Sequence, residues 1–416
     1  MTTGKRGTTP SGWTRVNADR IVGLDLARLL AILGMMTDHL LAGQGPNALQ
    51  VAVTGFPSTL FAVLGGVSAV LATGRLTVSG HPMRATLSLM LRAIVIIAIG
   101  GLIGVFQSPI IIVLVYYGVA LILTALLFRL PTAAILCIVA ALAVGGPQLN
   151  VWVRATSNLL TIGELSYDDP AAFARSALFT GTYPAVTWLA YMLSGVLIGR
   201  LLVDRPNRPR ALVTLGSVGA ALFAVGAAVQ IASQGAVMNV LEGKGLSHEA
   251  AEAVATGQGF GAPIQGGWFA VLNAAPHTGS TGDIIKTMGA AMIVITVFVA
   301  LTNRMRDVPV ILQPLQRAGG APLTVYTLHV LATAAATMYI TTRDTDDTLP
   351  PWAFGPGALA LQVFGVLLLG TILTLVKRRG PLEALNSAIA SLPSRSTKRG
   401  SHTERARAAT PESTAE

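Results

Sequence analysis

Long apolar runs separated by short polar segments recur along most of the chain. The runs 85–105 and 109–127 each approach the roughly 20 residues that a helix needs to cross the hydrocarbon core of a bilayer. Backbone polar groups in lipid must be hydrogen-bonded within the structure, so repeated runs of this length predict helices rather than sheet. We therefore expect an all-α, polytopic integral membrane bundle.

The hydropathy pattern predicts about ten transmembrane helices, with a margin of several residues at each end. The predicted spans are 21–42, 57–74, 85–106, 109–128, 132–149, 184–203, 211–233, 283–302, 321–341 and 354–376. An even number of spans places both termini on the same side of the membrane. The two longest segments on the opposite side, 150–183 and 234–282, contain Pro, Gly and scattered charges and are long enough to build a site.

This pattern divides the chain into an N-terminal segment, 1–20, a transmembrane domain, 21–380, and a tail, 381–416. The tail is rich in Ser, Thr, Arg, Ala and Pro, and such a composition buries too little apolar surface to fold alone. We expect the tail to be disordered.

Composition agrees with a membrane protein, because 52% of the residues are hydrophobic and only 12% are charged, against roughly 25% charged in soluble domains. The net charge of +10 raises the question of nucleic acid binding. Most of the 29 Lys and Arg residues, however, fall in the termini and in the segments on one side of the predicted spans. The positive-inside rule then places that side and both termini in the cytoplasm. We expect a protein of the plasma membrane with no nucleic acid partner.

Metal and thiol chemistry find no support in the sequence. Cys137 is the single cysteine and lies in an apolar run, which argues against disulfides and thiol catalysis. No His pair has metal-ligand spacing, and neither a Gly-rich phosphate loop nor a nucleophile elbow occurs. We expect no bound metal.

The first predicted span carries four ionisable residues, Asp25, Arg28, Asp38 and His39, in an otherwise apolar helix. Such residues usually face the interior of a bundle and mark functional paths. Asp25 and Arg28 are three positions apart and can pair on one helix face. An imidazole exchanges protons near neutral pH, and Asp38 beside His39 can tune this exchange. The alternative is a His39 that reaches the membrane interface and hydrogen-bonds a loop.

Further candidate residues occur in later spans and in the outer segments. Arg92 lies in the third span, beyond the cytoplasmic Arg75, His81 and Arg84, and clustered guanidinium groups bind phosphate bidentately. Ordinary cytoplasmic anchoring remains the alternative, and Arg92 lies deepest.

His329 lies about two turns into the ninth span, with Tyr326 three residues before it. It has either a functional role or a structural one, as a hydrogen bond that holds two helices together. His277 lies among hydroxyls and glycines in residues 275–281, a composition that suits either sugar binding or a tight turn.

Several blocks of the sequence are similar to those of one enzyme family. The blocks are 23–28 (Gly-Leu-Asp-Leu-Ala-Arg), 55–67, 181–188, 195–200, 276–279 (Pro-His-Thr-Gly) and 323–329 (Leu-Thr-Val-Tyr-Thr-Leu-His). In these blocks the chain resembles the transmembrane acetyltransferases related to heparan-α-glucosaminide N-acetyltransferase, including bacterial envelope relatives. The spacing from Arg28 to His39 is also similar to the first-span pattern of membrane acyltransferases that acylate envelope glycans.

The resemblance implies transfer of an acetyl or other short acyl group from cytoplasmic acyl-CoA, such as acetyl-CoA, to a hydroxyl or amine of an extracytoplasmic sugar or glycolipid. The lysosomal enzyme carries its key His in the loop after the first span, whereas residues 43–55 here contain none. His39 is then the expected base, with Asp38 orienting its ring and with His277 and His329 as further candidates. The implied cofactor site comprises Arg28, Arg84, Arg92, Asp25 and Tyr326, and the implied acceptor site comprises Tyr183, Trp188 and Trp268. Each of these aromatic residues is also a candidate interfacial anchor.

Two other functions remain open. In a transporter or flippase, Arg28, Arg92, His39 and His329 would line a pathway without covalent chemistry, although the absence of a visible internal repeat removes one common indication of this class. A membrane anchor of an envelope complex would tolerate substitution of these residues. The expected partners are membrane lipid, the acceptor and, as a further possibility, a second copy of the chain.

Overall fold

The computed structural model describes residues 14–15, 21–42, 48–106, 108–157, 165–204, 207–305, 307–342 and 350–393, without the side chains of 14, 15, 48, 51, 52 and 268. Every predicted span contains a helix, which confirms the all-α prediction. These helices are α1 Val22–Leu40, α3 Phe56–Val78, α4 Pro82–Ile103, α5 Leu114–Leu127, α6 Thr132–Thr156, α8 Ala185–Val203, α9 Arg208–Gly243, α11 Thr281–Thr302, α13 Pro322–Thr341 and α14 Gly355–Leu375. The shorter elements are α2 Ala48–Val53, α7 Pro170–Arg175, η1 Ser176–Thr180, α10 His248–Thr256, η2 Trp268–Leu272, α12 Leu312–Gly319 and α15 Pro381–Ala390, with β1 Thr14–Arg15 antiparallel to β2 Asp307–Val308.

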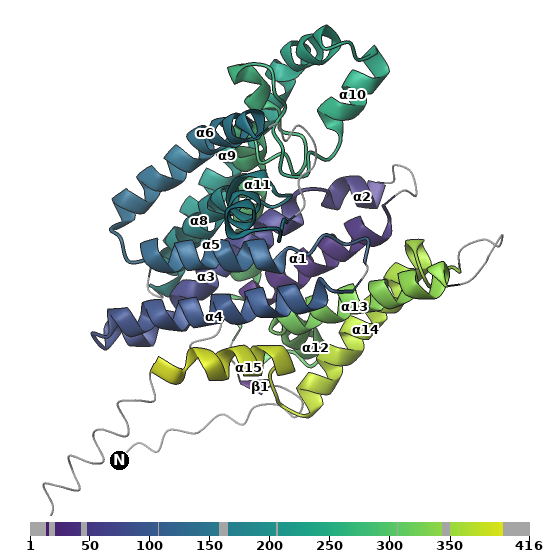
Figure 1. Cartoon of the computed structure of the whole chain (residues 1–416). Coiled ribbons are helices and arrows are strands. Elements are labelled where there is room, and N and C mark those ends of the chain that lie inside the picture. Colours follow the sequence, from purple (N-terminus) through teal and green to yellow (C-terminus); the bar gives the residue numbers. More distant parts are fainter. Residues whose placement is uncertain are drawn as a thin grey trace, which may run out of the picture.

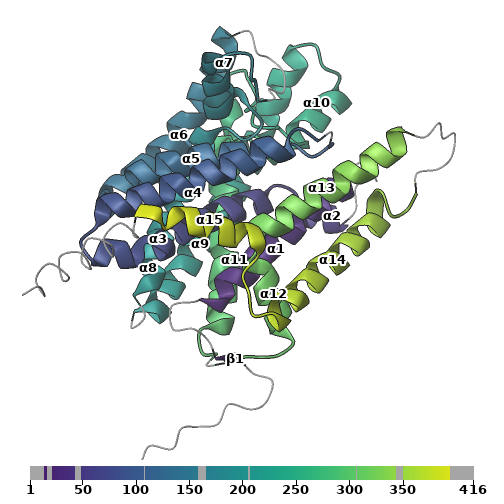
Figure 2. The ribbon, with the colours of Figure 1, turned by 60° about the horizontal axis from the view of Figure 1, so that its bottom comes forward.

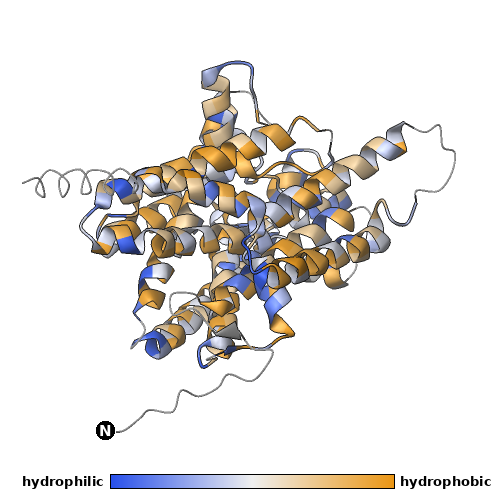
Figure 3. Ribbon diagram, turned by 90° about the horizontal axis from the view of Figure 1, so that it is seen from below, coloured by the Kyte–Doolittle hydropathy of each residue, from blue (hydrophilic) through white to orange (hydrophobic). Residues whose placement is uncertain are grey.

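Eight helices within the described residues are long and apolar enough to cross a membrane. The two other helices in predicted spans fall short for different reasons. Helix α1 carries Asp25, Arg28 and Asp38 within its 19 residues, and α5 has only 14 residues. Both lie inside the bundle, among the apolar helices (Figure 1). Hydrophobic residues dominate the helices, and hydrophilic residues concentrate at helix ends and loops (Figure 3).

Helix α1 occupies the centre of the bundle and packs against α3, α11, α12 and α14. Ionisable side chains are tolerated in a spanning helix when other helices surround it, so this position explains how α1 retains its charges. Glycines allow the close packing around it. A Cβ atom at Gly66 would overlap the carbonyl oxygen of Met192, and one at Gly195 would overlap that of Val63. Helices α3 and α8 therefore approach closely through small residues.

The predicted span 109–128 is only partly helical, because α5 begins at Leu114. Its first residues instead run as irregular backbone in which Ile110 and Val113 are buried. The backbone N–H of Val113 donates to the hydroxyl of Tyr326 on α13, with a distance of 3.2 Å. Irregular backbone at membrane depth is stable only where protein buries it or where it lines a cavity. This break marks the site described below.

The predicted start of the disordered tail needs correction. Residues 381–390, predicted to be disordered, form α15, which packs against α4 and α13, and residues 394–416 lie outside the described part. Glu383 of α15 accepts hydrogen bonds from the backbone N–H groups of Leu323 and Thr324, at 2.6 and 3.1 Å, and so caps the N-terminus of α13. The same contact holds α15, the helix that the composition of the tail concealed, against α13.

The outer segments are also more helical than predicted. Helix α9 continues for 36 residues, a length of roughly 54 Å, so its end projects well beyond a hydrocarbon core of about 30 Å. Helix α6 extends to Thr156 and carries a buried Arg154. The Arg154 guanidinium donates to the carbonyls of Thr180, Gly181 and Gly261, at 2.7, 3.3 and 3.3 Å. One side chain thus ties together the outer segments that precede α8 and α11.

Candidate active site

Among the described residues, two cavities lie within the bundle, one toward each end of α1, and we name them the outer and the cytoplasmic cavity after the topology that the sequence predicts. The outer cavity, of about 340 Å³, is lined by groups from α1, α13 and the outer loops, among them Asp38, His39, Tyr183, Gln258, His277 and Tyr326. The cytoplasmic cavity, of about 280 Å³, is lined by Arg28, Ser68, Arg92, Tyr117, Glu383 and Asn386 among others. The sequence-predicted residues therefore divide into two groups with different surroundings.

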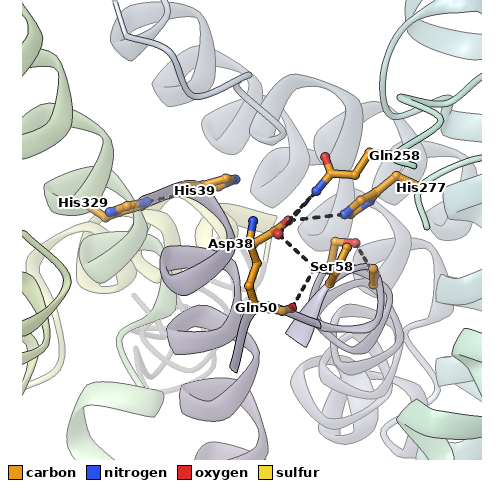
Figure 4. A network of polar contacts seen from close by, with 9 residues as sticks. Asp38, His39, Gln50, Ser58, Gln258, His277 and His329 are labelled. Carbon is orange, nitrogen blue, oxygen red and sulfur yellow. Dashed lines mark hydrogen bonds and ion pairs between the residues drawn. The ribbon is translucent and has the colours of Figure 1, made fainter. Parts of the chain in front are cut away.

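His39 and His329 form a hydrogen-bonded pair between α1 and α13 (Figure 4). The Nδ1 atom of His39 lies 3.1 Å from Nε2 of His329, and the two rings are within 3° of parallel. On its other edge, His329 Nδ1 lies 2.6 Å from the Oε1 atom of Gln362 on α14. Three helices thus contribute one side chain each to a continuous polar chain.

When both rings are neutral, their hydrogen-bond partners determine their tautomers. Gln362 Nε2 donates to the Thr333 hydroxyl, so its Oε1 faces His329 and can only accept. His329 must then donate from Nδ1 and accept at Nε2, which makes His39 the donor through its Nδ1. The lone pair of His39 lies on Nε2, on the ring edge opposite His329. This is the tautomer that a general base requires.

Asp38 forms a second polar cluster on the same cavity (Figure 4). Its Oδ2 atom lies 3.8 Å from His277 Nε2 and accepts a hydrogen bond from Gln258 Nε2 at 3.1 Å, while its Oδ1 atom accepts from the Thr54 hydroxyl at 3.2 Å. The expectation that Asp38 orients the His39 ring is therefore corrected: among the described contacts, His329 positions His39, and Asp38 holds His277. Adjacent positions on α1 serve two different histidines because their side chains leave the helix in different directions.

The loop before α11 presents His277 through a tight turn. His277 has a φ of +57°, a left-handed conformation that is uncommon for residues other than glycine. Its carbonyl accepts from the backbone N–H of Gly261 at 2.6 Å, and the carbonyl of Pro276 accepts from Gly259 at 2.8 Å. The two interpretations of residues 275–281, a tight turn and a sugar site, are therefore compatible, because the turn directs His277 to the cavity. Such conformations persist only where the surrounding structure enforces them.

The three aromatic residues predicted for the acceptor site have different positions. Tyr183 lines the outer cavity, edge-on to His277, and burial raises the pKa of its phenol. Trp188 is buried behind Tyr183 and edge-on to it, in the core rather than on the wall of the outer cavity. The side chain of Trp268 lies outside the described residues.

The predicted cofactor residues are also divided. Arg28 and Arg92 line the cytoplasmic cavity, and Arg28 contacts Asp25 Oδ1 at 2.7 Å and the Ser68 hydroxyl at 2.9 Å. Arg84 does not line this cavity, and Tyr326 lines the outer one. Arg84 precedes Arg92 by two turns of α4, which places it nearer the cytoplasmic end of the helix.

Helix α15 supplies cavity residues that sequence reasoning missed. The Oδ1 atom of Asn386 and the Nε atom of Arg92 are buried and have no hydrogen-bond partner in the described part of the protein. A buried donor or acceptor without a partner costs about 1–3 kcal/mol. Both residues line the cytoplasmic cavity, so each adds a polar group to its wall.

The two cavities approach each other at the start of α5 and on α13. The neighbours Val113 and Leu114 line the outer and the cytoplasmic cavity respectively, as do Tyr326 and Leu323 on α13. We term these residues the partition, and the hydrogen bond from Val113 to the Tyr326 hydroxyl links α13 to the backbone before α5 on its outer side. A group that reaches the partition from the cytoplasmic cavity thus approaches the outer cavity, which His39 and His277 line.

The fold and the two polar cavities define an integral membrane protein with a histidine site at its centre. Residues 20–229 match the family model described as heparan-alpha-glucosaminide N-acetyltransferase, catalytic. The match covers half of the chain, and the chain belongs to this family of membrane acetyltransferases. No curated protein sequence matches it.

The matched region contains Arg28, Asp38, His39, Arg92 and Tyr183, whereas His277, Tyr326, His329 and Asn386 lie beyond it. Among the described residues, no group of three or more His, Cys, Asp and Glu side chains is placed to hold a metal ion.

Proposed function

We propose that the protein transfers an acetyl group from cytoplasmic acetyl-CoA to an amine or hydroxyl of an extracytoplasmic sugar or glycolipid. In this proposal the protein lies in the plasma membrane with both termini in the cytoplasm. The observation that carries it is the hydrogen-bonded pair of His39 and His329, which leaves the lone pair of His39 Nε2 on the side of the outer cavity. Family membership supports the acetyl transfer itself.

The cytoplasmic cavity suits the pantetheine arm of acetyl-CoA. The arm carries secondary amides, and each offers one N–H donor and one carbonyl acceptor. Asn386 Oδ1 needs a donor and Arg92 Nε needs an acceptor, so an amide satisfies both kinds of group. A phosphate offers only acceptors at neutral pH and would leave Asn386 without a partner. The thioester end of the arm would then point toward the partition.

The transfer needs one base and one route for the leaving thiol. His39 Nε2 accepts the proton of the acceptor amine or hydroxyl as that group attacks the thioester carbonyl. A C–N or C–O bond forms, the C–S bond breaks, and the imidazolium returns its proton to the CoA thiolate. A positioned base of this kind contributes about 10²–10⁴-fold to the rate. Opening of the partition between Val113 and Tyr326 brings the thioester to the outer cavity.

Transport is the second candidate, and the closed partition is the observation that favours it. Two cavities on opposite sides of a thin barrier are also the arrangement that alternating access uses. Acetyl-CoA dependence separates the two functions. A transporter moves its substrate without releasing CoA thiol, whereas the transferase releases one thiol for each acetyl group transferred.

The test uses the full-length protein in lipid nanodiscs, with acetyl-CoA and glucosamine, and measures thiol release together with acetylated sugar. His39→Gln should reduce both products at least about 100-fold, because glutamine cannot act as a base. The matched control is His248→Gln, which replaces an exposed histidine on α10 that lines neither cavity and should retain full activity. Equal rates for wild type and His39→Gln would contradict the proposal.

A further inference from the structure

A third hollow opens on the flank of the bundle between α13 and α14, which run side by side there (Figure 2). Its volume of about 550 Å³ falls within the roughly 300–1,000 Å³ of small-molecule sites. We term it the lateral groove. Small and apolar side chains dominate its walls, including Leu328, Ala332, Ala335, Ala336, Phe364 and Gly365. His329 and Gln362 form its polar base.

The lateral groove extends along the outer part of α13. Tyr339 near the end of α13 and Trp352 before α14 both line it, and their rings meet edge-on with centroids 5.0 Å apart. Aromatic pairs of this kind are typical of the boundary between hydrocarbon and water. Both helices are apolar enough to cross a membrane, so the lateral groove opens toward lipid rather than water.

The lateral groove adjoins the outer cavity at two points. At its base, His329 lines the groove and contacts His39, which lines the outer cavity. At its aromatic end, Trp352 lines the groove, and Phe354, two residues later, lines the outer cavity. One amphiphilic molecule can therefore place a hydrocarbon chain in the groove and a polar head in the cavity.

We infer that the acceptor is a lipid-linked sugar whose hydrocarbon chain lies in the lateral groove while its sugar lies in the outer cavity. This inference rests on the proposed acetyl transfer. Lipid tails are as apolar as the groove wall, so the chain gains little from the hydrophobic effect on leaving the bilayer. The groove acts by positioning, because it holds the sugar next to His39 Nε2.

The test compares octadecyl glucosaminide with free glucosamine as acceptors for the full-length protein in nanodiscs. A chain concentrates any acceptor in the bilayer, so preference for octadecyl glucosaminide alone does not demonstrate use of the groove. Ala332→Phe fills the groove from an exposed position on α13 without changing that concentration effect. We expect it to lower the ratio of kcat/KM for octadecyl glucosaminide to that for glucosamine about tenfold, as overpacking of a site would. Ala221→Phe, on an exposed face of α9 that lines none of the three hollows, should leave the ratio unchanged.

A photoreactive octadecyl glucosaminide with a diazirine on the chain gives a readout that does not depend on turnover. Labelled peptides from α13 and α14, lost in Ala332→Phe, support the inference. Labelling elsewhere, or an unchanged kcat/KM ratio in Ala332→Phe, overturns it while leaving acetyl transfer to glucosamine intact. If no thiol is released with either acceptor, that result contradicts the proposed function instead. The labelled positions then still decide whether the groove holds the chain. A dimer cross-linked through α13 and α14 would assign the groove to a second copy and overturn the inference.

Discussion

His39 on α1 and His329 on α13 face each other with nearly parallel rings, and their facing nitrogens are 3.1 Å apart. The pair joins two segments 290 residues apart in the chain. Gln362 accepts the hydrogen bond of the His329 ring and thereby determines which nitrogen of the His39 ring bears the lone pair. The chemistry of His39 thus depends on two residues that need not touch either substrate.

The first prediction concerns Gln362 as a positioning residue. Gln362→Leu removes the acceptor for His329 Nδ1–H, which permits the other tautomer at His329 and then at His39. We expect kcat to fall about 10–100-fold, as for other residues that orient an imidazole, with little change in the KM for acetyl-CoA. Gln362→Glu keeps an acceptor oxygen and should retain most of kcat. A rise in KM alone, or equal losses in both variants, would contradict this role.

The second prediction concerns Asn386 in the cytoplasmic cavity. Asn386→Leu removes a buried acceptor that lacks a partner in the described structure, so the free protein should be as stable as wild type or more stable. The same change removes the contact that we propose between Asn386 and the pantetheine arm. We expect the KM for acetyl-CoA to rise about tenfold, the factor that a lost hydrogen bond of about 1.4 kcal/mol represents. Thermal unfolding and steady-state kinetics check the two effects separately, and a destabilised variant with unchanged KM would contradict the assignment.

The third prediction concerns Arg154 and the outer segments. Arg154→Met leaves the carbonyls of Thr180 and Gly181 without this buried donor, while Asn150 still donates to that of Gly261, and the change should lower the free energy of unfolding by about 1–3 kcal/mol. Because Gly181 and Gly261 flank the loops that carry Tyr183 and Gln258, we expect the KM for the acceptor to rise more than that for acetyl-CoA. Equal changes in both KM values would show that Arg154 acts on the whole fold instead.

The fourth prediction concerns the cap of α13 by Glu383. Glu383→Ala removes the acceptor for the N–H groups of Leu323 and Thr324, and loss of a helix cap costs about 0.5–2 kcal/mol. Thermal unfolding should show this loss as a lower melting temperature. Ser391→Ala serves as the control, because the Ser391 hydroxyl donates only to the carbonyl of Ala388 at the end of the same helix. An unchanged melting temperature in Glu383→Ala would show that α15 does not stabilise α13.

Hydrophobic periodicity was sufficient to predict the helical bundle, because membrane spans leave long apolar runs that depend on no partner. The same reasoning failed where tertiary contacts decide the structure. The break before Leu114 depends on Tyr326 on a distant helix, and α15 depends on its packing against α4 and α13. Neither relationship leaves a local signal.

The site was predictable to the extent that ionisable residues in apolar spans are costly, which singled out Arg28, His39, Arg92 and His329. The partners were not predictable. Gln362 is an uncharged residue in an apolar helix, and Gln258 lies in a loop between short helices. Sequence adjacency wrongly paired Asp38 with His39, because neighbouring side chains on a helix point about 100° apart.

The most direct test of the account is acetyl transfer by wild type and His39→Gln, measured by single turnover with acetyl-CoA already bound. If His39 is the base, His39→Gln binds acetyl-CoA with wild-type affinity but transfers its acetyl group to glucosamine at least about 100-fold more slowly. Transfer at the wild-type rate would contradict the central claim, and loss of acetyl-CoA binding would place His39 in the donor site instead.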